Sequence, residues 1–198
     1  MAERVRMIME AMVPELEDLK RRGWCSHDEV KMLAKRRERC EYLLHRPQPI
    51  REDFLHCLQL EMNLAALLRC RRKRLGLPKQ SAAQIAVRRR IHFVFCRAVR
   101  RFKGDERMWL EWITYAERTC ALNRLGKIYG RALALLPNSV LLWTKAAAFE
   151  LEMRSNATGA RRLLQRALRA NPKAADLWVA YFRLELIFGM RVRIRRRK

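Results

Sequence analysis

The chain has 198 residues, half of them apolar, which is enough for one continuous core but close to the upper size of a single domain. Its 44 Lys and Arg outnumber its 20 Asp and Glu, and the net charge of +24 indicates polyanionic partners. The excess is uneven, because residues 1–50 carry 11 basic and 9 acidic side chains, residues 51–103 carry 14 and 3, and residues 104–198 carry 19 and 8.

Composition also sets the expected compartment and fold class. No run of about eighteen uncharged apolar residues is present and the first turns of the chain are charged, so we expect neither a membrane-spanning helix nor a secretory signal. The 6 cysteines are scattered through apolar stretches without a CxxC pair, as is typical of reduced thiols in intracellular proteins. Only 7 Gly and 6 Pro interrupt a chain rich in good helix formers, which predicts an all-α fold.

The amino-terminal region, residues 1–50, is expected to form two helical stretches. The first carries an apolar stripe that Pro14 kinks or restarts, and Gly23 ends it. The sequence Ser26–Glu29 is a capping box, in which the serine oxygen and the glutamate side chain satisfy backbone amides at a helix start. A second helix should therefore run to about His45.

Residues 51–103 are expected to form an antiparallel helix pair. The first helix, about 51–74, opens with Phe54 and reaches Glu61 seven residues later. The second helix, about 82–102, follows a loop.

The tryptophans mark a helical repeat. Trp109, Trp143 and Trp178 recur every 34 or 35 residues, and each opens an apolar helical stretch. Such a period is typical of arrays of helix pairs, in which each pair buries its apolar stripe against its neighbours. The residues expected to form the repeat core are Phe54, Glu61, Trp109, Tyr129, Ala132, Pro137, Trp143, Glu150, Ala167, Pro172, Trp178 and Glu185.

This array should occupy residues 51–189, with further pairs at about 107–136 and 139–170 and a lone last helix from about 174 to 189. Because no partner helix follows in the sequence, the last helix should expose an apolar face. The basic residues 190–198 are expected to form a frayed tail. They could act in targeting or RNA binding, or reflect an altered translation end.

The repeat resembles the half-a-tetratricopeptide (HAT) repeat, which has a tryptophan, a glutamate seven residues later, and a second helix with an Arg-Ala-Leu core. The amino-terminal region resembles, more specifically, the opening of the U3 small nucleolar RNA-associated protein 6 family. The segments that carry this resemblance are Pro14–Glu17, Gly23–Glu29, Glu41–Arg46, Glu52–Phe54, Glu61 and Arg71–Gly76.

The resemblance implies a HAT and tetratricopeptide-like solenoid of antiparallel helix pairs, without catalytic activity or cofactors, in the nucleus and nucleolus. It implies a scaffold subunit of the UTP-B subcomplex of the small-subunit processome, the U3 snoRNP that processes pre-18S rRNA in 40S subunit biogenesis. The implied partners are other UTP-B subunits, including WD40-propeller proteins, and U3 snoRNA or pre-rRNA, with no membrane and no small-molecule substrate. The alternatives are a HAT scaffold of the spliceosome or of mRNA 3′-end processing, and a nonspecific RNA-binding module.

RNA contact is expected at basic clusters on the two helices of residues 51–103. Such clusters neutralise phosphates and give affinity with little sequence choice. The alternative interpretation is a solvated helix face. We expect the clusters to share one end of the helix pair. The candidate residues are Arg71, Arg72, Lys73, Arg74, Arg88, Arg89, Arg90, Arg100, Arg101 and Lys103.

Other candidate chemistry lacks the spacing it needs. Cys25, His27, Cys40 and His45 match no common zinc finger. The repeat aromatics have core spacing rather than an arrangement for stacking on bases, and the repeat glutamates suit inter-helix hydrogen bonds. No phosphate loop, nucleophile elbow or HExxH motif is present. We therefore expect no metal site and no enzymatic activity.

Overall fold

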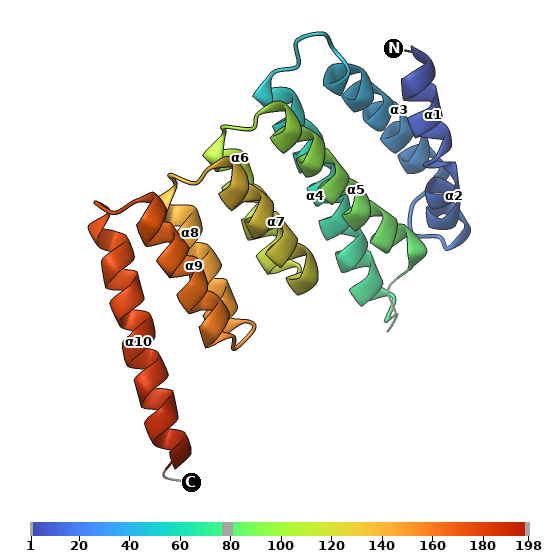
Figure 1. Ribbon diagram of the computed structural model, residues 1–198. Coiled ribbons are helices and arrows are strands. Elements are labelled where there is room, and N and C mark those ends of the chain that lie inside the picture. The colour runs from blue at the N-terminus through green and yellow to red at the C-terminus, as the bar shows by residue number, and fades with distance from the viewer. Residues whose placement is uncertain (1, 77–80, 197–198) are drawn as a thin grey trace. The chain divides into compact units, whose positions relative to one another are not determined.

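The computed structural model describes residues 2–76 and 81–196, and all regular secondary structure in these ranges is helical (Figure 1). The chain divides into two compact units, Met1–Phe102 and Lys103–Lys198. The first unit contains α1 (Ala2–Glu10), α2 (Val13–Arg21), α3 (His27–Leu44), α4 (Arg51–Arg74) and α5 (Ala82–Arg101). The second contains α6 (Glu106–Arg118), α7 (Leu122–Leu135), α8 (Val140–Glu152), α9 (Ala157–Ala170) and α10 (Ala175–Arg196).

The first unit is built around the antiparallel pair of α4 and α5, which lie side by side in Figure 1. Gln84 near the start of α5 donates to the carbonyl of Leu68 near the end of α4. At the other end of the pair, the rings of Phe54 and Phe102 meet edge to face at 5.7 Å. Helix α3 packs on α4, α2 packs on both α3 and α5, and α1 packs on α3.

Local signals set the helix boundaries in residues 2–50. Pro14 occupies the first turn of α2, where its missing amide hydrogen removes no hydrogen bond. Gly23 follows α2 with φ +66°, a left-handed conformation that glycine adopts without a Cβ clash. The capping box predicted at the start of α3 is present, with Ser26 and Glu29 joined by reciprocal hydrogen bonds of 2.9 and 3.1 Å.

The second unit is a row of antiparallel pairs, α6 with α7 and α8 with α9, followed by α10 against α9. Ala132 in α7 and Ala167 in α9 are fully buried, so each second helix can approach its neighbours closely. These pairs have the bounds expected from the repeat to within a few residues. The predicted all-α array of antiparallel helix pairs is therefore confirmed.

Three details differ from the sequence-based expectations. The two units replace the single continuous core, and the expected boundary at residue 50 lies inside the first unit because α3 packs on α4. The last helix does not end at Gly189 but continues through Arg196. A glycine inside a helix costs only about 1 kcal/mol relative to alanine, and no proline follows it, so the expected frayed tail is largely helical. Within the expected loop 75–81, residues 77–80 lie outside the described residues, as do residues 197–198 of the tail.

Candidate functional site

A chain of buried ion pairs joins four helices of the first unit. Glu61 of α4 accepts hydrogen bonds from Arg37 of α3 and from Arg90 of α5, each through Nε at 2.8 Å. Arg37 also binds Glu15 of α2 at 2.9 Å, and Arg90 binds Glu41 of α3 at 3.0 Å. The network therefore connects α2, α3, α4 and α5.

The ion-pair network is extended by Arg97, which binds the second carboxylate oxygen of Glu41 at 2.7 Å. Three arginines thus face three glutamates, and the cluster carries no net formal charge. Although burial disfavours the charged guanidinium, the carboxylates of Glu61 and Glu15 raise the pKa of Arg37. Burial raises the pKa of Glu15 despite the neighbouring Arg37. Since each charge has an opposite charge at hydrogen-bond distance, the network fixes how the helices pack rather than forming a reactive centre.

The ion-pair network changes the role of one RNA-binding candidate. Arg90 is buried, with all its charge directed at Glu61 and Glu41, so it offers nothing to a phosphate. A run of three arginines on a helix spans nearly a full turn, and one of the three therefore points into the core. Arg89 is exposed and Arg88 is half-buried.

Arg71 is likewise a structural residue rather than a free cation. Its guanidinium binds both carboxylate oxygens of Glu29, at 2.5 and 2.8 Å, and donates to the carbonyl of Trp24. This clamp holds the start of α3 on the end of α4. The pKa of Glu29 is lowered to about 2 by the hydrogen bond from Arg71, with a further contribution from the backbone amide of Ser26.

The remaining basic candidates do not share one end of the helix pair. Arg72, Lys73 and Arg74 end α4, beside the start of α5, whereas Arg100 and Arg101 end α5 beside the start of α4. Because α5 has 20 residues, the two ends are roughly 30 Å apart at about 1.5 Å per residue. Lys103 is exposed and belongs to the second unit.

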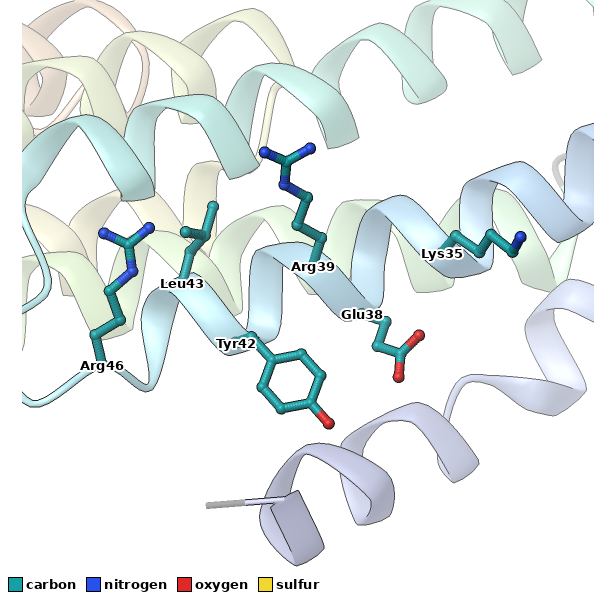
Figure 2. A pocket seen from close by; sticks show the side chains of 6 residues that line it. All are labelled: Lys35, Glu38, Arg39, Tyr42, Leu43 and Arg46. Carbon is teal, nitrogen blue, oxygen red and sulfur yellow. The ribbon is translucent and has the colours of Figure 1, made fainter.

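A second basic surface, not predicted from the sequence, lies on α3 and the turn that follows it (Figure 2). We call Lys35, Arg39, Tyr42 and Arg46 the α3 patch. All four are exposed and line one shallow groove together with Glu38 and Leu43. Figure 2 shows Arg39 and Arg46 extending to the same side of α3, with Leu43 between them and Tyr42 on the other side.

The α3 patch escaped notice because its cations are separated in sequence rather than forming a run. Their spacings of four, three and four residues keep them on one helix face, and this is the signal that could have found them. Guanidinium groups flanking an exposed tyrosine can contact phosphates and stack on a base.

The tryptophans have a shared bonding pattern that explains their spacing from the prolines. The indole of Trp143 donates to the carbonyl of Pro137 at 2.8 Å, and that of Trp178 donates to Pro172 at 3.3 Å. In the first repeat Lys103 replaces the proline, and its carbonyl still accepts from Trp109 at 3.4 Å. The position requires a carbonyl and not a proline side chain. Pro137 and Pro172 are accordingly exposed in the turns rather than buried in the core.

The other expected core positions are placed as follows. Phe54, Tyr129, Trp109 and Trp143 are buried. Trp178 differs, because 55% of its surface is exposed. No helix described in the chain covers that side of α10, so the tryptophan lacks the partner that buries its equivalents.

The two remaining repeat glutamates make different contacts. Glu150 accepts from Asn156 at 3.0 Å and from Arg154 at 3.2 Å, which ties the end of α8 to the start of α9. Glu185 of α10 binds Arg161 of α9 through two hydrogen bonds of 2.6 and 2.7 Å. Neither carboxylate faces a second acid, as general acid–base chemistry on a paired-carboxylate site would require.

The cysteines and the longer helices bear on metal binding and membrane insertion. Among the described residues, no group of three or more His, Cys, Asp or Glu side chains has the arrangement of a metal site. Cys25 lies beside Arg71 at 3.4 Å, and Cys40 lies beside Cys57, so these thiols belong to the packing of α3 against α4. None of the helices in residues 2–76 and 81–196 is both long and apolar enough to cross a membrane.

Comparison with known proteins assigns both parts of the chain. Residues 9–92 match the family model for U3 small nucleolar RNA-associated protein 6, and residues 94–189 match the model for the PRP39 N-terminal HAT repeat. The Schizosaccharomyces pombe protein named U3 small nucleolar RNA-associated protein 6 is 41% identical over 189 residues, which is 95% of this chain. The chain belongs to the U3 small nucleolar RNA-associated protein 6 family.

Other relatives in this family share the similarity along almost the entire chain. The human homolog is 36% identical over 194 residues, 98% of this chain, and the Dictyostelium discoideum homolog is 28% identical over 186 residues, 94% of it. The chain spans 39% of the length of the S. pombe protein and 32% of the human one. The HAT repeats expected from the tryptophan period are matched in the second half of the chain.

Proposed function

We propose that this chain is a non-catalytic scaffold of the small-subunit processome, the U3 snoRNP, and acts in nucleolar pre-18S rRNA processing and 40S subunit biogenesis. The observation that carries the proposal is its identity of 36 to 41% with proteins named for U3 small nucleolar RNA, over nearly its full length. Those relatives are longer, so the chain supplies one portion of the scaffold that they form.

The arrangement of charged groups supports a binding role over a catalytic one. The buried carboxylates Glu15, Glu41 and Glu61 are each paired with arginine, which leaves none of them available as a general base. Rows of helix pairs offer long surfaces to partner proteins. We propose that other UTP-B subunits, including WD40-propeller proteins, bind these surfaces.

Direct RNA contact is the second part of the proposal. The exposed cations are the α3 patch, the carboxyl-terminal ends of α4 and α5, and Arg89. Because they are spread over separate faces rather than gathered into one channel, they favour several phosphate contacts with U3 snoRNA or pre-rRNA. Such contacts add affinity without reading sequence.

Affinity purification of the tagged full chain from cells tests this function. We expect U3 snoRNA, 18S rRNA precursors and UTP-B proteins to be enriched over the tag alone and over spliceosomal RNAs. The triple variant Arg72→Gln, Lys73→Gln and Arg74→Gln separates direct from indirect RNA recovery. If RNA is recovered only through partners, this variant should retain both the proteins and the RNA.

A spliceosomal role is the second candidate, since residues 94–189 match a HAT model named for PRP39. That model covers only the second unit, whereas the relatives named for U3 align with both units. Enrichment of spliceosomal RNAs in place of U3 snoRNA would reverse the order of the two candidates. Tight RNA binding by the purified chain alone, with no partner proteins recovered, would favour a nonspecific RNA-binding module instead.

A further inference from the structure

The last helix, α10, exposes a row of five large apolar side chains spaced four residues apart. An i, i+4 row is one of the ridges by which helices pack into each other's grooves, and this row extends along roughly 24 Å of helix. Isolated exposed apolar residues are ordinary on protein surfaces, but a continuous ridge of this kind marks an interaction site. We call these side chains the α10 row: Trp178, Phe182, Leu186, Met190 and Ile194.

The preceding repeats show what covers this row. Trp143 and Ala147 of α8 occupy the positions of Trp178 and Phe182, and both are buried. The guanidinium of Arg166 on α9 lies 5.9 Å from the ring centre of Trp143, which places α9 over this side of α8. The α10 row is therefore the face against which the second helix of a repeat packs.

The opposite face of α10 is already occupied. Leu177 and Leu184 are buried, Glu185 binds Arg161 of α9, and Phe188 lies under the same guanidinium at 4.8 Å. Helix α9 thus contacts α10 as the helix before it in the array. An occupant of the α10 row adds a second neighbour and displaces no existing contact.

We propose that the α10 row binds an amphipathic helix of a partner protein, antiparallel to α10 as α9 is to α8, with small residues facing Phe182 and acidic residues in its first turn. Phe182 stands where Ala147 stands in α8, so the helix opposite it needs small side chains. This proposal concerns protein binding and does not depend on the processome role.

Charge determines the acidic requirement. Four of the six residues 191–196 are arginine, and an antiparallel partner places its amino-terminal turn beside them. Acidic side chains there interact favourably with both these arginines and the positive end of the partner's own helix dipole. A second copy of this chain fits less well, because it carries +24 itself and offers Asp176 as the one acid in the first turn of α10.

Trp178 provides a direct probe of occupancy. It is the exposed one of the five tryptophans, since Trp24, Trp109, Trp112 and Trp143 are all buried. Acrylamide quenching of the purified full chain should therefore report mainly on Trp178. The titrant is a peptide with the sequence of residues 156–171 in which Arg161 and Arg162 are replaced by glutamate, a helix of the required shape and charge.

Binding of this acidic peptide should protect Trp178 and reduce quenching about twofold or more at saturation. Phe182→Glu introduces a charge into the centre of the row and should weaken peptide binding about tenfold or more. Leu135→Glu, which alters an exposed apolar side chain of α7 outside the row, should bind as the unmodified chain does. Circular dichroism of both variants verifies that the helices are intact.

Three results would overturn the proposal. Equal binding to Phe182→Glu and to the unmodified chain would place the peptide elsewhere, and the absence of any protection at millimolar peptide would show that the row is no helix-binding site. Equal binding of the unaltered basic peptide would remove the acidic requirement. Protection that grows with chain concentration alone, with a doubled mass that Phe182→Glu abolishes, would identify a second copy as the occupant.

Discussion

Arg90 reaches from α5 into the core to bind Glu61 at 2.8 Å and Glu41 at 3.0 Å, while Arg89, its neighbour in sequence, is exposed. Adjacent arginines in one run therefore have opposite roles. Removing a single partner from a buried ion pair leaves an uncompensated charge.

Arg90→Gln should destabilise the first unit by about 3–5 kcal/mol, because Glu61 and Glu41 each lose a buried cation. The neighbouring substitution Arg89→Gln is the matched control and should change stability by less than about 0.5 kcal/mol. Urea denaturation followed by circular dichroism measures both. Similar stability of the two variants would show that the network is not what holds these helices together.

The second prediction concerns the clamp between Arg71 and Glu29, which lowers the pKa of Glu29 to about 2. Since this folded-state pKa lies below the unfolded value, the clamp stabilises the fold above the ordinary glutamate pKa of 4.5 and loses this effect as the pH falls toward 2. Arg71→Gln should return the pKa of Glu29 toward about 4.3. Carbon-detected NMR titration of the glutamate carboxyl groups reports this shift, and an unaltered low pKa in the variant would contradict the assignment.

Two exposed basic surfaces are expected to contribute separately to RNA affinity. Replacing Lys35, Arg39 and Arg46 with Gln should reduce the slope of the logarithm of affinity against the logarithm of salt concentration. Each phosphate that the variant no longer neutralises lowers that slope by about 0.7 for single-stranded RNA. Binding of a pre-rRNA fragment at several salt concentrations measures it.

The matched comparison for the α3 patch is the triple variant of Arg72, Lys73 and Arg74, which keeps Arg71 in place. Gln is nearly as good a helix former as Arg or Lys, so the helical signal should not change in either variant. A slope that stays constant in both would assign the charge to solvation and RNA recovery to partner proteins.

The fourth prediction compares two tryptophans at equivalent repeat positions. Trp143→Ala should destabilise the second unit by about 3–5 kcal/mol, since the indole is buried and donates to the carbonyl of Pro137. Trp178→Ala removes a largely exposed indole and should cost much less. Thermal melts of the two variants provide the measurement. Equal destabilisation by the two substitutions would mean that the α10 row is covered in the purified chain.

Sequence reasoning could predict the helices because their signals are local. The capping box at Ser26, the restart at Pro14 and the tryptophan period each act within a few turns. The ion-pair network was beyond reach because its members are separated by 22 to 49 residues. Which face of α5 is buried depends on α2 and α3, and so the basic run of residues 88–90 gave no indication that one member points inward.

The exposed Trp178 illustrates the complementary limit. Its spacing is that of a core residue, and periodicity alone places it with Trp143. Burial also requires a neighbouring helix, which spacing within one helix does not supply. The same reasoning did predict an apolar face on the last helix, but it could not resolve which side chains of α10 form the open row.

The bond from each tryptophan to the carbonyl six residues before it has a consequence for how such chains can change in length. Both groups lie within one repeat, so each unit carries its own closure between turn and helix. Deletion of residues 138–172 would bring Trp178 six residues after Pro137 and restore the same bond in a shorter protein. Gene duplication or loss in steps of 35 residues can thus lengthen or shorten the array without compensating substitutions elsewhere.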